Sequence, residues 1–253
     1  MEKKYVLITG ATSGFGKACA QLFAKNNFNL ILTGRRNERL QVLKSELSTT
    51  TSVETLCFDV RNEAEVFQSI ESLPEHVKNH ISILINNAGL AVGRGSIDEG
   101  LIDDWDRMID TNVKGLLYVT RAVVPYIKKS GEGHIINIGS IAGKEVYSGG
   151  NVYCASKHAV DALSKAMRID LLPFGIKVTN IAPGAADTEF SLVRFKGDEG
   201  IAKSVYEGFQ PLKAEDVANV IYFAASLPAH VNINDLTIMP TAQASASHLF
   251  KND

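Results

Sequence analysis

The sequence predicts an α/β fold, a doubly wound parallel sheet of about seven strands with helices on both faces. Three observations support this prediction. Short apolar runs rich in Val, Ile and Leu recur along the chain, helix-type apolar patterns separate them, and glycine-containing turns follow several of them. No repeat, linker or low-complexity block divides the 253 residues. We therefore expect residues 1–253 to form a single domain.

The predicted elements alternate along the whole chain. Runs of four to nine apolar or β-branched residues are typical of buried strands. The predicted strands cover residues 5–9, 29–33, 53–60, 81–85, 134–138, 176–182 and 236–239. The predicted helices begin near residues 17, 38, 62, 105, 152 and 215.

Two segments stand outside this alternation. A long polar stretch at about 185–212 follows the sixth strand, and loops of this length after a strand are often substrate lids. Small residues are frequent in the segment 240–253, which we expect to be a C-terminal tail.

Composition excludes several classes of protein. Hydrophobic residues make up 45% and charged residues 21% of the chain, which is typical of soluble globular domains. A net charge of -2 gives no electrostatic footprint for nucleic acid or anionic membranes. The three cysteines are scattered without metal-ligand spacing, which favours a reducing compartment and no metal site. Apolar runs are too short for a signal peptide or a membrane span, so we expect a cytoplasmic protein.

A glycine turn joins the first strand to the first helix, reading TGATSGFG at 9–16. Glycines allow a tight turn and a close approach to phosphates, and the helix start supplies free N–H groups. This context predicts dinucleotide binding. The spacing TGxxxGxG differs from GxGxxG, and simple turn chemistry is the alternative.

Arg35 and Arg36 follow the second strand, at the position that selects between NAD and NADP. An acidic residue here would hold the ribose hydroxyls of NAD. Guanidinium groups suit the 2′-phosphate of NADP, because they bind phosphate in pairs. The alternative is a pair of solvated arginines before a helix.

Tyr153 and Lys157 lie four residues apart at the start of a predicted helix, on one face. A neighbouring cation pulls the phenol pKa of about 10 toward neutral, which would make Tyr153 a usable acid or base. Ser140, after the fifth strand, is available to bond the same reacting oxygen. A surface Tyr and Lys at helical spacing are the alternative. Asn112 is unfavourable inside a helix, which hints at function, although an exposed polar residue is the simpler interpretation.

Over essentially its whole length, the sequence resembles the short-chain dehydrogenase/reductase family, which has a Rossmann-like fold. The combination of motifs in this order is highly specific. The motifs are TGATSGFG at 9–16, Asp59-Val60, NNAG at 86–89, Asn112, Ser140, YCASK at 153–157, Pro183-Gly184 and Thr188.

The resemblance implies a role for each catalytic residue. Tyr153 is the general acid/base, and Lys157 lowers its pKa and binds the nicotinamide ribose. Ser140 positions the substrate oxygen. Asn112 holds a water that connects Lys157 to solvent.

The resemblance also implies an NADP site. Ser13 stands where many NADP-using relatives have a basic residue, so the preference for NADP depends on Arg35 and Arg36. The implied cofactor residues are Gly10, Gly14 and Gly16 at the pyrophosphate, Arg35 and Arg36 at the 2′-phosphate, Asp59 and Val60 at the adenine, Asn86 at the adenosine ribose, Lys157 at the nicotinamide ribose, and Pro183, Gly184 and Thr188 at the nicotinamide end. Thr12, Ser13, Phe15, Ala88 and Tyr153 are further cofactor residues that the resemblance implies.

Three further stretches, 149–153, 189–198 and 227–234, resemble NADP-dependent 3-hydroxy-acid dehydrogenases. Such enzymes oxidise serine, allo-threonine and 3-hydroxypropionate-type acids, and in reverse reduce 3-oxo acids. Their substrate carboxylate needs a cationic partner, and we expect Arg194 of the lid to bind it, with Lys196 as the other candidate. The alternative for both is ordinary lid surface charge or a salt bridge between subunits.

Other functions stay open at this point. A ketone or 3-oxoacyl reductase of the same family would act on a neutral or carrier-bound substrate. A non-catalytic NADP sensor or a structural interaction protein would not need Ser140, Tyr153, Lys157 and Asn112 together. The resemblance further implies a homotetramer, with the helices around 105–124 and 152–172 packing between subunits.

Overall fold

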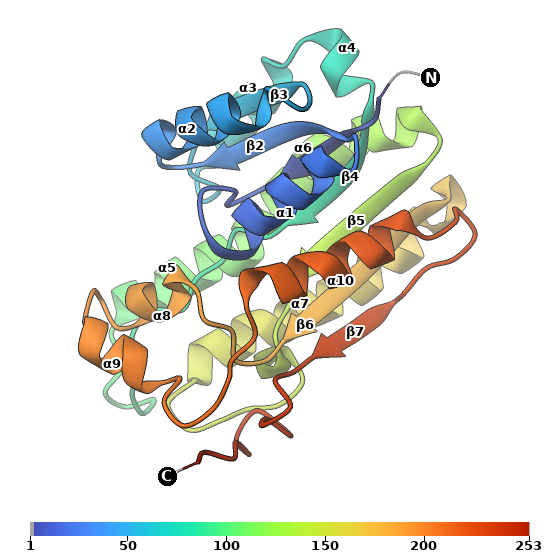
Figure 1. Cartoon of the computed structure of the whole chain (residues 1–253). Coiled ribbons are helices and arrows are strands. Elements are labelled where there is room, and N and C mark those ends of the chain that lie inside the picture. The colour runs from blue at the N-terminus through green and yellow to red at the C-terminus, as the bar shows by residue number, and fades with distance from the viewer. Residues whose placement is uncertain (1–2, 253) are drawn as a thin grey trace.

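Parallel strands form a central sheet in the computed structural model, which describes residues 3–252 (Figure 1). The strand order is β3-β2-β1-β4-β5-β6-β7. Successive strands are added toward one edge from β1 to β3 and toward the other edge from β4 to β7, so the topological switch point lies between β1 and β4. The predicted doubly wound sheet is confirmed. The strands are β1 (Tyr5–Ile8), β2 (Asn29–Gly34), β3 (Val53–Cys57), β4 (Ile81–Asn86), β5 (Gly133–Ile138), β6 (Ile176–Pro183) and β7 (Asp235–Ile238).

Helices cover both faces of the sheet (Figure 1). Helices α1, α2 and α10 pack on one face, and α3, α6 and α7 pack on the other. In the described part, no helix is both long enough and apolar enough to cross a membrane. The helices are α1 (Gly14–Lys25), α2 (Asn37–Leu47), α3 (Glu63–Glu71), α4 (Glu75–Lys78), α5 (Ile102–Ile109), α6 (Leu116–Ser130), α7 (Asn151–Leu171), α8 (Glu189–Arg194), α9 (Glu199–Ser204) and α10 (Ala214–Ser226).

Each face of the sheet has its own hydrophobic core. Successive side chains of a strand point to opposite faces. In β1, Val6 and Ile8 therefore pack with α1 and α10, while Tyr5 and Leu7 pack with α6 and α7. Burying an aliphatic side chain stabilises the fold by about 1.5–3 kcal/mol. The two cores make the sheet a rigid frame for its carboxyl edge.

The helix predicted around residues 105–124 is interrupted. The chain runs from α5 into a π-helical turn, η1 (Asp110–Gly115), and then into α6. Short π-helical insertions of this kind are frequent at functional sites. The turn contains Asn112, the residue that fits a helix interior poorly.

The predicted lid contains two short helices, α8 and α9, which the sequence analysis did not anticipate. Thr188 caps α8 and Asp198 caps α9 through their side-chain oxygens. In Figure 1 both helices lie beyond the carboxyl ends of the strands, on the side of the C-terminus. The tail returns to this lid, because the Asn252 amide donates to the Gly208 carbonyl.

Candidate active site

A cavity of about 890 Å³ opens at the carboxyl edge of the sheet, between the strand ends, the lid and the tail. Ligands of open parallel sheets bind at this edge, where the chain direction reverses. Most of the residues predicted for the cofactor, the substrate or catalysis line this cavity. They are Gly10, Thr12, Ser13, Gly14, Phe15, Arg35, Arg36, Asp59, Val60, Ala88, Ser140, Tyr153, Lys157, Pro183, Gly184, Thr188 and Arg194.

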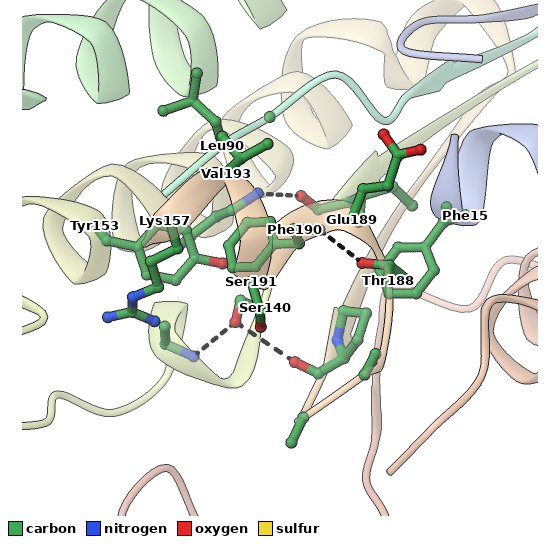
Figure 2. Close-up of a pocket in the computed structure, with 18 of the residues that line it drawn as sticks. Phe15, Leu90, Ser140, Tyr153, Lys157, Thr188, Glu189, Phe190, Ser191 and Val193 are labelled. Carbon is green, nitrogen blue, oxygen red and sulfur yellow. Dashed lines mark hydrogen bonds between the residues drawn. The ribbon is translucent and has the colours of Figure 1, made fainter. Parts of the chain in front are cut away.

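Tyr153 and Lys157 lie one turn apart at the start of α7, and both are buried. The Lys157 Nζ donates a hydrogen bond to the Ile138 carbonyl at 2.8 Å. The Phe190 ring of the lid lies 5.7 Å from the Tyr153 ring, centroid to centroid. Figure 2 shows Tyr153, Lys157 and Ser140 around the cavity, with Phe190 beside them. Water is therefore largely kept from the two titratable groups.

Burial governs the proton affinity of both groups. It lowers the pKa of Lys157 to about 8 and raises the pKa of Tyr153 above its ordinary value. The charge of Tyr147 adds to the rise in the Tyr153 pKa, while hydrogen bonding by Ser140 and the charge of Arg194 act against it. The Tyr–Lys spacing predicted a lowered phenol pKa. In the protein alone the direction is opposite, because desolvation outweighs the Ser140 hydrogen bond and the charge of Arg194.

Ser140 follows β5 and begins the short 3₁₀ turn η2 (Ile141–Gly143). Its Oγ accepts the Ala142 amide at 3.1 Å and donates to the Pro183 carbonyl at 3.4 Å. These bonds hold the hydroxyl at the cavity wall that Tyr153 also lines.

Asn112 lies behind the cavity instead of in its wall. Its Oδ1 accepts the Leu90 amide, and its Nδ2 donates to the Leu90 carbonyl and to the Ser156 hydroxyl. Both Nδ2 hydrogens are thus used, so the side chain fixes the backbone after β4. Gly89 fits between Asn112 and Lys157, because a Cβ at Gly89 would lie 3.2 Å from Asn112 Oδ1 and 3.4 Å from Lys157 Nζ. The predicted water on Asn112 stays a prediction.

The glycine turn has the backbone that the sequence requires. Gly10 and Gly14 have positive φ angles of 64° and 49°, a conformation that glycine adopts readily. Gly16 supports the turn and does not line the cavity, so its place at the pyrophosphate stays a prediction. A Cβ at Gly16 would lie 2.4 Å from the Gly10 carbonyl oxygen.

Asn86, predicted to lie beside the adenosine ribose, does not line the cavity. Its side chain is buried in the sheet, where its Nδ2 donates to Thr120 Oγ1 and to Asn137 Oδ1. The neighbouring Asn87 lines the cavity instead. Adjacent strand residues face opposite sides, so only one of the two asparagines can lie in the cavity wall.

Arg36 is fixed against the glycine turn. Its guanidinium donates to Thr12 Oγ1 at 2.9 Å and to Ser13 Oγ at 2.9 Å. Ser13 therefore contributes to this region although it is not basic. Arg35 lies 3.7 Å from Asp59, nitrogen to oxygen, and its side chain is 58% exposed.

Arg194 reaches the catalytic end of the cavity from the last residue of α8. Its guanidinium carbon lies 5.4 Å from the Tyr147 ring centroid and 5.7 Å from the Tyr153 ring centroid. Its Nε is buried without a hydrogen-bond partner among residues 3–252. Lys196, the other candidate, pairs with Asp104 at 2.8 Å and does not line this cavity.

Several cavity residues escaped the sequence analysis. Glu189 and Phe190 lie in a stretch that carried the resemblance, yet nothing in the local pattern shows which way they point. Further lining residues missed from sequence are Asn87, Arg94 and Tyr147.

Residues 4–198 match the family model described as short chain dehydrogenase. The chain belongs to the short-chain dehydrogenase/reductase family. This match covers the glycine turn, the Tyr–Lys pair and the start of the lid. The site residues described above, up to Arg194, lie within the matched range.

Several family members are similar over nearly the full length. Sulfoacetaldehyde reductase 2 of Chromohalobacter salexigens is 50% identical over 240 residues, covering 94% of this chain and 95% of the relative. The NADP-dependent 3-hydroxy acid dehydrogenase YdfG of Escherichia coli K12 is 48% identical over 242 residues, covering 95% and 96%. Among solved structures, the closed form of serine dehydrogenase complexed with NADP+ superposes with a TM-score of 0.91 at 47% identity, covering 98% of this chain and 100% of that one.

Proposed function

We propose that this short-chain dehydrogenase/reductase catalyses reversible, NADP-dependent hydride transfer at the hydroxyl-bearing carbon of small 3-hydroxy acids. In one direction it oxidises serine-, allo-threonine- or 3-hydroxypropionate-type acids, and in the other it reduces 3-oxo acids. The observation that supports this best is the half-buried guanidinium of Arg194 beside the Tyr153 ring, in the cavity that Ser140 and Lys157 also line.

The residues at the other end of the cavity fit NADP. Gly10 and Gly14 leave room for a pyrophosphate beside the start of α1. Arg36 presents a guanidinium fork suited to a 2′-phosphate, with Arg35 beside it. When bound, NADP supplies or accepts the hydride, and the positive charge of its oxidised ring favours a phenolate at Tyr153.

In the reductive direction, the protein supplies the proton. The substrate carbonyl carbon gains a hydride, and its oxygen gains the proton of the Tyr153 hydroxyl. The raised pKa of Tyr153 keeps that proton in place until charge develops on the substrate oxygen. The Ser140 hydroxyl stabilises this charge, and Lys157 stands one turn away to restore the proton. Oxidation is the same sequence in reverse.

Arg194 supports an acidic substrate. Its buried Nε lacks a hydrogen-bond partner in the described part of the chain, and leaving a buried donor unsatisfied is costly. A substrate carboxylate would satisfy that donor while its hydroxyl faces Ser140 and Tyr153. A neutral ketone would leave the guanidinium unmatched, which argues against the alternative reductase activities.

A sulfonate substrate is a second candidate, since one 50% identical relative is named a sulfoacetaldehyde reductase. In sulfoacetaldehyde and in 3-oxopropionate the carbonyl carbon and the anionic group are separated by one methylene carbon. Either anion would therefore present oxygen acceptors to Arg194 at a similar place.

The test is NADPH formation by the purified enzyme with NADP+ and a small panel. The panel contains L-serine, L-allo-threonine, 3-hydroxypropionate, 2-hydroxyethanesulfonate and uncharged alcohols of matching size, repeated with NAD+. We expect turnover of the acids with NADP+ and little with uncharged alcohols. Turnover of uncharged alcohols alone would exclude the acid assignment, and silence throughout would favour a carrier-bound substrate or a sensor.

Residues 185–212 would act as the substrate lid, because they place Phe190 and Arg194 over Tyr153. We also propose a cytoplasmic homotetramer. Exposed apolar side chains near the predicted subunit contacts support the assembly. These side chains are Leu101, Ile102, Leu117, Ile169, Leu172 and Phe174. Light scattering of the purified protein tests the oligomeric state.

A further inference from the structure

Glu189 of the lid binds Arg36, which lines the cofactor end of the cavity, and Arg39 of α2, which lies outside the cavity wall. It is the first residue of α8, directly after Thr188. One carboxylate oxygen accepts Arg36 Nη1 at 2.8 Å, and the other accepts Arg39 Nη1 at 2.7 Å. Two guanidinium groups that follow β2 therefore bind the same carboxylate, which belongs to a segment about 150 residues later in the chain.

The same two guanidinium groups have the chemistry of a phosphate site. Arg36 is anchored to Thr12 and Ser13 of the glycine turn, so it stays at the cavity whatever anion it binds. Paired guanidinium forks bind phosphate and carboxylate oxygens alike. The position after the second strand is where this fold distinguishes NADP from NAD.

We propose that Glu189 occupies the place of the cofactor 2′-phosphate on Arg36 and Arg39, so that NADP(H) must exchange this lid carboxylate for its own phosphate. This rests on the proposed NADP dependence. Glu189 is thereby a specificity-determining residue, which tempers the affinity for NADP(H) and leaves the affinity for NAD(H) unaffected.

The exposure of the three side chains makes such an exchange feasible. Glu189 is 43% exposed, Arg36 42% and Arg39 48%, so water solvates each group once the pairs separate. A phosphate and a carboxylate on the same guanidinium groups would repel one another. Nearby, Asp59 is already paired with Arg61 at 2.7 Å and lies 3.7 Å from Arg35.

The exchange would also be transmitted to the catalytic end. Helix α8 has six residues, with Glu189 at one end and Arg194 at the other. Thr188 lies against the glycine turn, because a Cβ at Gly14 would be 3.4 Å from it. Releasing Glu189 therefore frees the segment that positions Phe190 beside Tyr153.

Direct binding tests the proposal without turnover. NADPH and NADH are titrated into the full-length enzyme by fluorescence, for the wild type, Glu189→Gln and the control Glu199→Gln. Glu199 lies on α9 of the same lid, is exposed and pairs only loosely with Lys203 at 3.7 Å. We expect Glu189→Gln to tighten NADPH binding by about twofold to tenfold, the effect of removing a half-exposed competing charge. NADH binding should be unchanged, and Glu199→Gln should match the wild type.

A second pair of probes isolates the phosphate. Adenosine 2′,5′-bisphosphate should gain affinity in Glu189→Gln as NADPH does, whereas 5′-AMP should not. Weaker NADPH binding by Glu189→Gln would mean that Glu189 organises the arginines, and an equal change for NADPH and NADH would mean a general effect on the lid. Either result overturns the proposal. A wild type that binds NADH as tightly as NADPH would instead contradict the proposed cofactor.

Discussion

The two ends of the cavity control charge in different ways. At the catalytic end, Tyr153 and Lys157 are buried, Lys157 bonds a backbone carbonyl, and burial is the largest cause of both pKa shifts. At the phosphate end, Arg36 and Glu189 are half-exposed and neutralise each other directly. Burial holds a group in one protonation state until chemistry demands a change, whereas exposed ion pairs can exchange partners. The enzyme thus combines a fixed catalytic end with an adaptable binding end.

The largest expected effect breaks the catalytic end alone. Tyr153→Phe keeps the ring that packs beside Phe190 but removes the hydroxyl, so we expect turnover to fall by about 10²–10⁴-fold. NADPH binding should stay within about twofold of wild type, because the arginines lie at the other end. Single-turnover kinetics together with fluorescence titration measure both quantities. Near-normal turnover would remove Tyr153 from its catalytic role.

Local patterns were sufficient for the frame of the molecule. Apolar runs and glycine turns located all the strands of the described sheet, and the Tyr153–Lys157 spacing placed both side chains at one cavity. These features depend on residues close in sequence. A strand buried on both faces, however, shows no alternation, so nothing local distinguished Asn86, which faces the core, from Asn87, which faces the cavity.

Long-range features could not be predicted from local patterns. Glu189 meets Arg36 across 153 positions of the chain, and no spacing rule connects them. The direction of the Tyr153 pKa shift depends on how deeply the side chain is buried, which is a property of packing. The π-helical turn at Asn112 was suggested only as a poor fit to a helix.

A smaller effect is expected at the substrate contact. Arg194→Gln keeps most of the side-chain volume and removes the charge, so KM for a 3-hydroxy acid should rise by about tenfold to 100-fold, the range for a lost charged hydrogen bond. KM for an uncharged alcohol should stay constant, and so should NADPH binding. Lys203→Gln, an exposed cation of the same lid, is the matched control. An equal rise for acids and uncharged alcohols would show that Arg194 supports the fold of the lid instead.

The smallest expected effect is the contribution of Lys157 to the pH dependence of the unfolding free energy, which tests whether burial controls charge at the catalytic end. The folded pKa of Lys157, about 8, lies below the unfolded value of about 10.5, so between these values the unfolded chain binds more protons. Stability should therefore rise with pH in this window, by at most about 1.4 kcal/mol per pH unit, in the wild type relative to Lys157→Met. Urea unfolding at pH 7, 8 and 9.5 measures the difference. These pH values lie below the ordinary tyrosine pKa of about 10, above which the raised Tyr153 pKa would make stability fall with pH.

Repeating the urea series at high salt separates the two mechanisms. A shift caused by burial should persist, whereas NADPH affinity at the exposed arginines should fall, because salt screens exposed charges much more than buried ones. If the Lys157 difference disappeared with salt, repulsion from nearby cations would be its cause, because an ion pair would raise a lysine pKa instead of lowering it. Its persistence would mean that desolvation lowers the pKa of Lys157, so that burial by the surrounding protein sets the proton affinity of the lysine beside Tyr153.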